Sequence, residues 1–131
     1  MPTLTRRIDP KTASAPALRA FFRLADRWGL DIDQQMLLLG VTARSTFFKW
    51  KKDEDGHLSV DTLERISYLL GIFKALHILL PDDEAADSWI KRANDAPIFA
   101  GRPALDRMLS GRVSDLYVVR AYLDAQRGGW S

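Results

Sequence analysis

The chain has 131 residues, of which 47% are hydrophobic and 10% aromatic, and its formal net charge is +2. This length and composition indicate one compact unit, or two small lobes that share a core, and exclude a disordered chain. The absence of cysteine excludes disulfides, thiolate metal sites and catalytic thiols, and it fits a reducing compartment.

No segment has the pattern of a signal peptide, because no apolar run follows Arg6 and Arg7. The longest apolar run, residues 66–80, is interrupted by Lys74 and His77 and is too short to span a bilayer. We therefore expect a soluble, cytoplasmic protein.

Residues 1–16 contain prolines and small residues without periodicity, and they are predicted to form an extended N-terminal arm. Two interpretations stay open. The arm is a disordered terminus, or its cations Arg6, Arg7 and Lys11 contact DNA or a partner protein.

Residues 17–28 are predicted to form an amphipathic helix that ends at Gly29. A second helix follows, with Asp31 as its N-cap and Leu39 as its last residue. Its buried side is predicted to consist of Met36, Leu37 and Leu39. After a turn at Gly40, a third helix is predicted to start with Thr42 as its N-cap and to continue through Lys52, with Phe47 and Trp50 turned toward the core.

Two short helices joined by a glycine turn, with a basic second helix, are typical of a helix-turn-helix module that reads DNA. A helix fits the major groove, where its early residues reach base edges and its basic residues hold phosphates. The charge distribution agrees, since residues 1–56 carry ten Lys and Arg against seven Asp and Glu, while residues 57–131 carry nine against ten. The alternative is a merely solvated basic face on a bundle that binds protein. The candidate DNA-binding residues are Thr42, Arg44, Ser45, Thr46, Lys49, Lys51 and Lys52.

This segment resembles the helix-turn-helix of the Xre family. The family's Gly-Val-Thr/Ser start is matched at residues 40–42, and its closing Trp-Lys pair is matched by Trp50 and Lys51. One departure is visible: the interval from Gly40 to Phe47 is one residue longer than the common pattern.

A polar loop at residues 53–57 makes a poor metal site, because His57 has no second histidine near it. Ser59 is predicted to cap the next helix. Residues 60–80 are so rich in apolar side chains that burial on more than one side is expected, with a break into two helices at Gly71. For residues 72–80 the core of the chain and a homodimer contact are open alternatives. The candidate dimerisation residues are Ile72, Phe73, Leu76, Leu79 and Leu80.

After Pro81, a helix capped by Asp82 or Asp83 is predicted to run to Ala93. A loop, a short helix at residues 103–110 and a last helix starting at Ser114 or Asp115 follow. In the last helix Leu116, Val119 and Leu123 repeat at helical spacing.

The last forty or so residues resemble the toxin-binding domain of Xre/MbcA/ParS-type antitoxins. The resemblance is carried by a Trp-bearing helix, then Asn94, Phe99 and Gly101, the segment 103–109 closing on Gly111, and a long helix ending in residues 127–130. It implies an antitoxin that silences a toxin and represses its own operon. It also implies a RES-domain, NAD-consuming toxin whose active site the antitoxin blocks. The candidate toxin-binding residues are Arg102, Asp106, Arg107, Gly111, Arg112, Arg127, Gly128, Gly129 and Trp130.

The sequence thus predicts an all-α fold, with an N-terminal helix-turn-helix bundle and a small helical toxin-binding domain. The expected organisation is an arm at 1–16, a DNA-binding-like domain at 17–71 and a toxin-binding and dimerisation domain at 72–131. The expected partners are a toxin, operator DNA and a second copy of the chain. A stand-alone transcriptional regulator without a toxin is the alternative. Two distant histidines, without a phosphate-binding loop or metal-ligand spacing, do not indicate an enzyme, and no catalytic residue, metal or cofactor is predicted.

Overall fold

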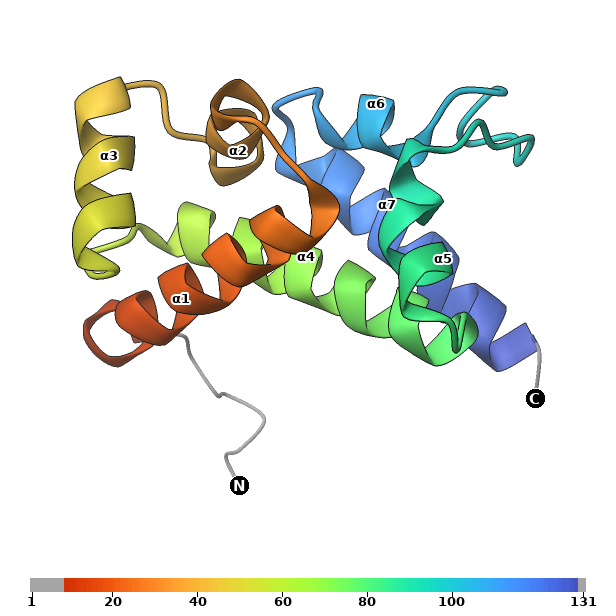
Figure 1. Cartoon of the computed structure of the whole chain (residues 1–131), viewed down its shortest axis with the longest axis horizontal. Coiled ribbons are helices and arrows are strands. Elements are labelled where there is room, and N and C mark those ends of the chain that lie inside the picture. The colour runs from red at the N-terminus through yellow and green to blue at the C-terminus, as the bar shows by residue number, and fades with distance from the viewer. Residues whose placement is uncertain (1–8, 130–131) are drawn as a thin grey trace.

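The computed structural model describes residues 9–129 and consists of helices joined by short loops (Figure 1). The predicted all-α fold class is confirmed. Within residues 9–129 the extended backbone pairs at an isolated bridge between Ala93 and Pro103. The elements in chain order are α1 (Pro10–Trp28), α2 (Ile32–Leu39), α3 (Arg44–Asp53), α4 (Val60–Leu79), α5 (Asp83–Ser88), the 3-10 helix η2 (Trp89–Lys91), α6 (Ala104–Met108) and α7 (Val113–Gly129).

The helix α4 is the axis of the molecule, since α1, α2, α5 and α7 all pack against it (Figure 1). Its most extensive contact is with α7, and the next is with α1. Burial on more than one side of this helix is therefore confirmed. Its buried apolar residues are Leu63, Ile66, Leu69, Ile72, Ala75 and Leu76.

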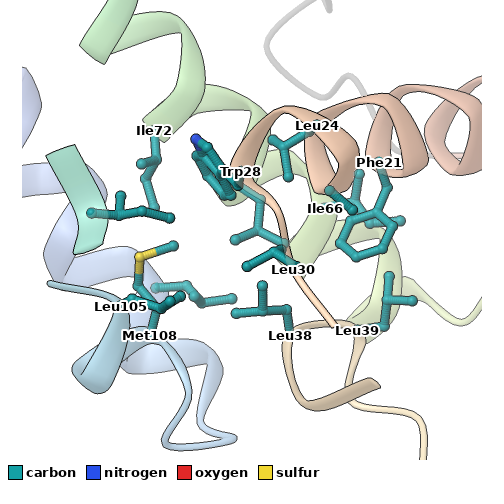
Figure 2. Close-up of a cluster of buried hydrophobic side chains, with 14 of the residues drawn as sticks. Phe21, Leu24, Trp28, Leu30, Leu38, Leu39, Ile66, Ile72, Leu105 and Met108 are labelled. Carbon is teal, nitrogen blue, oxygen red and sulfur yellow. The ribbon is translucent and has the colours of Figure 1, made fainter. Parts of the chain in front are cut away.

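One hydrophobic cluster joins the first helices of the chain to the last. Figure 2 shows Trp28 of α1, Leu38 of α2, Ile72 of α4 and Met108 of α6 as members of this cluster. Because burying apolar surface is the main stabilising term in folding, the two halves of the chain stabilise each other.

The predicted break at Gly71 is wrong, because α4 is continuous from Val60 to Leu79. A Cβ at Gly71 would lie 2.4 Å from the guanidinium carbon of Arg120. Arg120 extends from α7 and donates from Nη1 to the Ser67 carbonyl at 3.4 Å. The glycine therefore makes room for a side chain from the neighbouring helix, and the lost helix propensity is offset by packing.

The predicted extended arm is wrong for residues 10–16, which form the first turns of α1. Pro10 is the first residue of α1, a position where proline is tolerated, whereas Pro16 lies inside the helix. Ser14 is 2% exposed, and its Oγ accepts a hydrogen bond from the Leu58 amide at 3.1 Å. This contact with a distant loop stabilises turns that local propensity did not predict. Arg6 and Arg7, and the side chain of Lys11, lie outside what the structure describes.

The predicted cap of α2 is confirmed, since the Asp31 carboxylate accepts from the Gln34 amide at 2.7 Å. Gly40 ends this helix in the left-handed region, with φ of 72°. The predicted buried side needs one correction: Leu37 is 45% exposed, whereas Leu38 is fully buried. The sequence Leu37-Leu38-Leu39 does not by itself show which leucine faces outward.

The remaining predictions on helix ends are mostly confirmed. Ser59 caps α4 and Asp82 caps α5. The helix after Asp82 is shorter than predicted, because its last turn is the tighter η2 and the chain leaves it at Arg92. Among the described helices none is long and apolar enough to cross a membrane.

Candidate functional surfaces

The helix α3 lies at the edge of the molecule, remote from α5 and α7 (Figure 1). It begins one residue later than predicted: Ala43, not Thr42, is the N-cap, and no side chain caps its first turn. Its helical hydrogen bonding starts from the Ala43 carbonyl, which accepts from the Phe47 amide at 3.2 Å. Residues 40–43 form the connection between α2 and α3.

Phe47 anchors α3 to the core, as predicted. It is fully buried, and its ring meets that of Phe22 edge to face at 5.9 Å. Trp50 is half-buried and packs against the same core. Phe47 and Trp50 therefore define the side of α3 that faces the core, and the opposite side is open to solvent.

The candidate DNA-binding residues are exposed, except for Thr46, which is partly buried. Lys51 places its Nζ 5.0 Å from the centre of the Phe22 ring. Arg44 pairs with Asp33 at 2.9 Å, and both side chains are more than half exposed. An exposed pair contributes little free energy, so a phosphate can compete for this guanidinium.

The sequence interpretation missed one residue of this surface. Phe48 follows the buried Phe47, yet it is 45% exposed. The sequence did contain a signal for its exposure. Phe48 lies four residues after Arg44 and four before Lys52, and residues spaced by four share a helix face.

A second candidate surface is an open groove of about 670 Å³ between the 94–103 loop, α6 and the start of α7. Four of the predicted toxin-binding residues line it, namely Arg102, Asp106, Arg107 and Arg112. The sequence interpretation missed its apolar lining and its central carboxylate, which are Ile98, Phe99, Pro103, Leu109 and Asp115.

Asp115 organises one wall of the groove. Its carboxylate accepts from Ser110 Oγ at 2.6 Å and from Arg107 Nε at 2.9 Å, and Arg112 Nε lies 3.3 Å away. The hydrogen bond from Ser110 lowers the pKa of Asp115 most, and Arg107 and Arg112 add to this, while burial works against it. The carboxylate is therefore the ionised centre of a partly buried network.

Arg107 also donates from Nη1 to the Ile98 carbonyl at 2.9 Å. It therefore connects the 94–103 loop, α6 and α7, and its main role is to hold the groove in shape. Arg102 and Arg112 differ from it, because their side chains are 74% and 76% exposed. Arg102 makes an exposed pair with Asp106 at 3.2 Å.

The two glycines of this region allow backbone turns. Gly101 and Gly111 have φ of 81° and 89°, a region that L-residues with side chains rarely adopt. A Cβ at either position would meet nothing within 4 Å. Within this chain, the two glycines therefore serve to form turns. The open space beside them is accessible to a partner.

The C-terminal candidates lie apart from the groove. The chain from Arg112 to Arg127 spans roughly 22 Å of helix, at a rise of about 1.5 Å per residue. Arg127 lies near the far end of α7, where it pairs with Asp124 at 3.7 Å, and Gly128 and Gly129 continue the helix. Trp130 lies outside the described residues. The predicted toxin-binding set thus divides between the two ends of one helix.

The predicted dimerisation set also divides. Ile72 and Leu76 are 0% and 1% exposed within the single chain, so the dimer prediction is wrong for them and the core alternative holds. They pack inward because α4 has buried residues on more than one side. Phe73, Leu79 and Leu80 are partly exposed and stay candidates.

Comparison with known proteins assigns two family domains to the chain. Residues 7–71 match the model of the antitoxin Xre-like helix-turn-helix domain. Residues 75–129 match the model of the antitoxin Xre/MbcA/ParS C-terminal toxin-binding domain. The chain is also 60% identical over 119 residues to the uncharacterized protein y4oB of Sinorhizobium fredii, an alignment covering 90% of each chain. No group of three or more His, Cys, Asp or Glu side chains suited to a metal occurs in the described part of the molecule.

Proposed function

The chain belongs to the Xre/MbcA/ParS-type antitoxins, and from this membership we propose that it neutralises a cognate toxin and represses its own operon. The observation that carries the proposal is the presence of both family domains on a single chain, each with an exposed candidate surface of its own. The toxin is bound by the C-terminal domain, and operator DNA is bound by α3.

The groove and the end of α7 are the proposed toxin-binding surface. Arg102 and Arg112 are the exposed cations at the groove, and Arg127 is the cation at the far end of α7. Arginine is over-represented among residues that dominate binding energy, because its planar fork makes several directed hydrogen bonds. The partner that the family resemblance favours is a RES-domain toxin that degrades NAD, with its active site blocked in the complex.

The toxin-binding proposal is tested by co-expressing the chain with the product of the adjacent reading frame, followed by size-exclusion chromatography with light scattering. A stable complex is expected, and its mass gives the stoichiometry. The double substitution Arg102→Ala and Arg112→Ala should weaken the complex about tenfold or more, as should deletion of residues 127–131. Arg23→Ala, at an exposed position of α1, is the matched control.

Two outcomes would oppose this assignment. If the doubly substituted groove variant and the truncated chain both bind as tightly as the control, the toxin uses another surface. If no complex forms, a stand-alone regulator is the better interpretation. The RES assignment has its own readout, which is a fall of cellular NAD when the neighbour is expressed alone.

The proposed operator contact is tested with a duplex covering the region upstream of the chain's own coding sequence. Arg44→Ala with Lys49→Ala should weaken binding about tenfold or more, because each cation holds phosphate or a base edge. The salt dependence of binding should become shallower by about one unit of slope for each phosphate that the variant no longer neutralises. Lys74→Ala, an exposed lysine on α4, is the control. Unchanged affinity in the α3 variant would remove α3 from the DNA interface.

A further inference from the structure

Phe48 is the most exposed aromatic side chain of α3, at 45%, and nearly half of its surface stays in contact with solvent. Its neighbour Phe47 is fully buried, and the two rings meet edge to face at 5.5 Å. Such a contact with an immobile ring restricts the Phe48 side chain at the surface. It is therefore presented outward in a defined direction.

Phe48 lies on the side of α3 that faces away from the core. Successive residues of a helix are about 100° apart, so Ser45, Phe48 and Lys52 share one face, opposite Phe47 and Trp50. All three are exposed. A single apolar ring therefore lies on this helix face between one hydroxyl and one cation.

This pattern fits DNA better than it fits a protein partner. Protein interfaces have cores depleted of charged residues, whereas Phe48 is surrounded on α3 by Arg44, Lys49 and Lys52. In the major groove, cations of this kind reach phosphates and purine edges. The feature of the groove that an apolar side chain recognises is the C5-methyl group of thymine.

We propose that Phe48 contacts thymine methyl groups and makes the operator affinity of this chain depend on them. The inference rests on the proposed binding of operator DNA through α3. It adds a contact that Arg44, Ser45 and Lys49 do not supply, since their hydroxyl and cationic groups recognise hydrogen-bonding groups and not methyl groups.

The test uses the full chain and the duplex from the upstream region that it protects in a footprint. This duplex is prepared with thymine and, separately, with deoxyuridine, which keeps the base pairing and lacks only the C5-methyl group. The wild-type chain should bind the deoxyuridine duplex about fourfold more weakly for each methyl group contacted, the factor expected for one buried methylene-sized group.

Phe48→Ala should bind the thymine duplex with the same reduction in affinity, and it should no longer distinguish the two duplexes. Leu37→Ala is the matched control, because Leu37 on α2 is also 45% exposed. It should keep the wild-type preference for thymine. If Phe48→Ala does not fold, Phe48→Gln replaces it, since glutamine keeps a long side chain and a good helix propensity at this position.

Each other result overturns the inference. If wild-type chain binds both duplexes equally, the operator-binding proposal stands and Phe48 does not read thymine. If the Phe48 variants keep the wild-type preference, another residue reads the methyl groups. A variant that keeps the preference and also changes its mass in light scattering assigns Phe48 to a contact between protein chains. If the wild-type chain gives no footprint in the upstream region, the proposed operator function fails as well.

Discussion

At the scale of single residues, Asp115 determines the shape of the groove. The side chain of Asp115 is 11% exposed, and its carboxylate accepts hydrogen bonds from Ser110, Arg107 and Arg112. These three residues belong to α6 or to the turn between α6 and α7. Arg107 extends the network to the Ile98 carbonyl. A charged group this deeply placed is tolerated because its hydrogen bonds replace those that water would make.

Asp115→Asn should lower the free energy of unfolding at neutral pH by about 1–3 kcal/mol, because it removes a charge-assisted network. The pKa of Asp115 is lowered below the ordinary 3.8 by the Ser110 hydroxyl and the two arginines. A carboxylate whose pKa falls on folding stabilises the protein above the unfolded pKa, and this stabilisation is lost as pH drops through the folded value.

The difference between wild type and Asp115→Asn should therefore shrink below about pH 4. Urea unfolding from neutral to acidic pH measures it. Asp106→Asn is the control, since its exposed pair with Arg102 should contribute less than about 1 kcal/mol. A difference between wild type and Asp115→Asn that stays constant with pH would show that the carboxylate charge is not what stabilises the groove.

At the scale of elements, caps and core periodicity could be predicted from sequence because they depend on nearby residues. Asp31 and Ser59 accept hydrogen bonds from amides three residues later. Leu116 and Leu123 are buried at helical spacing. Such signals lie within a turn or two of chain, where the local pattern is sufficient.

The sequence predictions that failed concern residues whose contacts lie far away in the chain. The first turns of α1 depend on Ser14 and the Leu58 amide, 44 residues apart. Gly71 looks like a helix stop until Arg120 is seen beside it. In the candidate groove the arginines were found from sequence, but their division into the structural Arg107 and the exposed Arg102 required the fold, since only tertiary contacts distinguish them.

The role of Gly71 can be measured with a double-mutant cycle. In an Arg120→Ala background, Gly71→Ala should raise the free energy of unfolding by about 0.5–1 kcal/mol, because alanine is the better helix former. In the wild-type background the increase should be smaller, since the new methyl group displaces the Arg120 guanidinium. Thermal or urea unfolding of the four variants gives the coupling. Equal increases in both backgrounds would mean that Arg120 does not require a glycine at this position.

At the scale of the whole molecule, the two family domains share one helix. The matched regions end at residue 71 and begin again at residue 75, and both positions lie inside α4. The helices α1 and α7 pack on this same element, and one hydrophobic cluster runs through both halves. The sequence predicted one compact unit or two lobes with a shared core, and the single hydrophobic cluster that contains residues of both halves agrees with this prediction.

The chain should therefore unfold in a single cooperative transition. Calorimetry should give equal calorimetric and van't Hoff enthalpies, and the fragments 1–74 and 75–131 should lack a cooperative transition, because each loses part of α4 or its packing partners. Far-UV circular dichroism of the fragments is the second measurement. Two separate transitions in the full chain, or a fragment that folds alone, would contradict the shared core.

The helix α3 lies at one end of this single unit and the C-terminal end of α7 at the other (Figure 1), whereas the groove lies between the 94–103 loop, α6 and the start of α7. A partner bound at the end of α7 would therefore lie on the opposite side of the molecule from α3 (Figure 1).

The proposed antitoxin function is measured most directly by bacterial growth, with the adjacent reading frame expressed alone and together with this chain. We expect growth to stop in the first case and to be restored in the second. Restoration should survive Arg44→Ala with Lys49→Ala, and it should disappear when residues 127–131 are deleted or Arg102 and Arg112 are replaced by alanine. A harmless neighbour, or arrest that persists with the wild-type chain present, would contradict the antitoxin function proposed for this molecule.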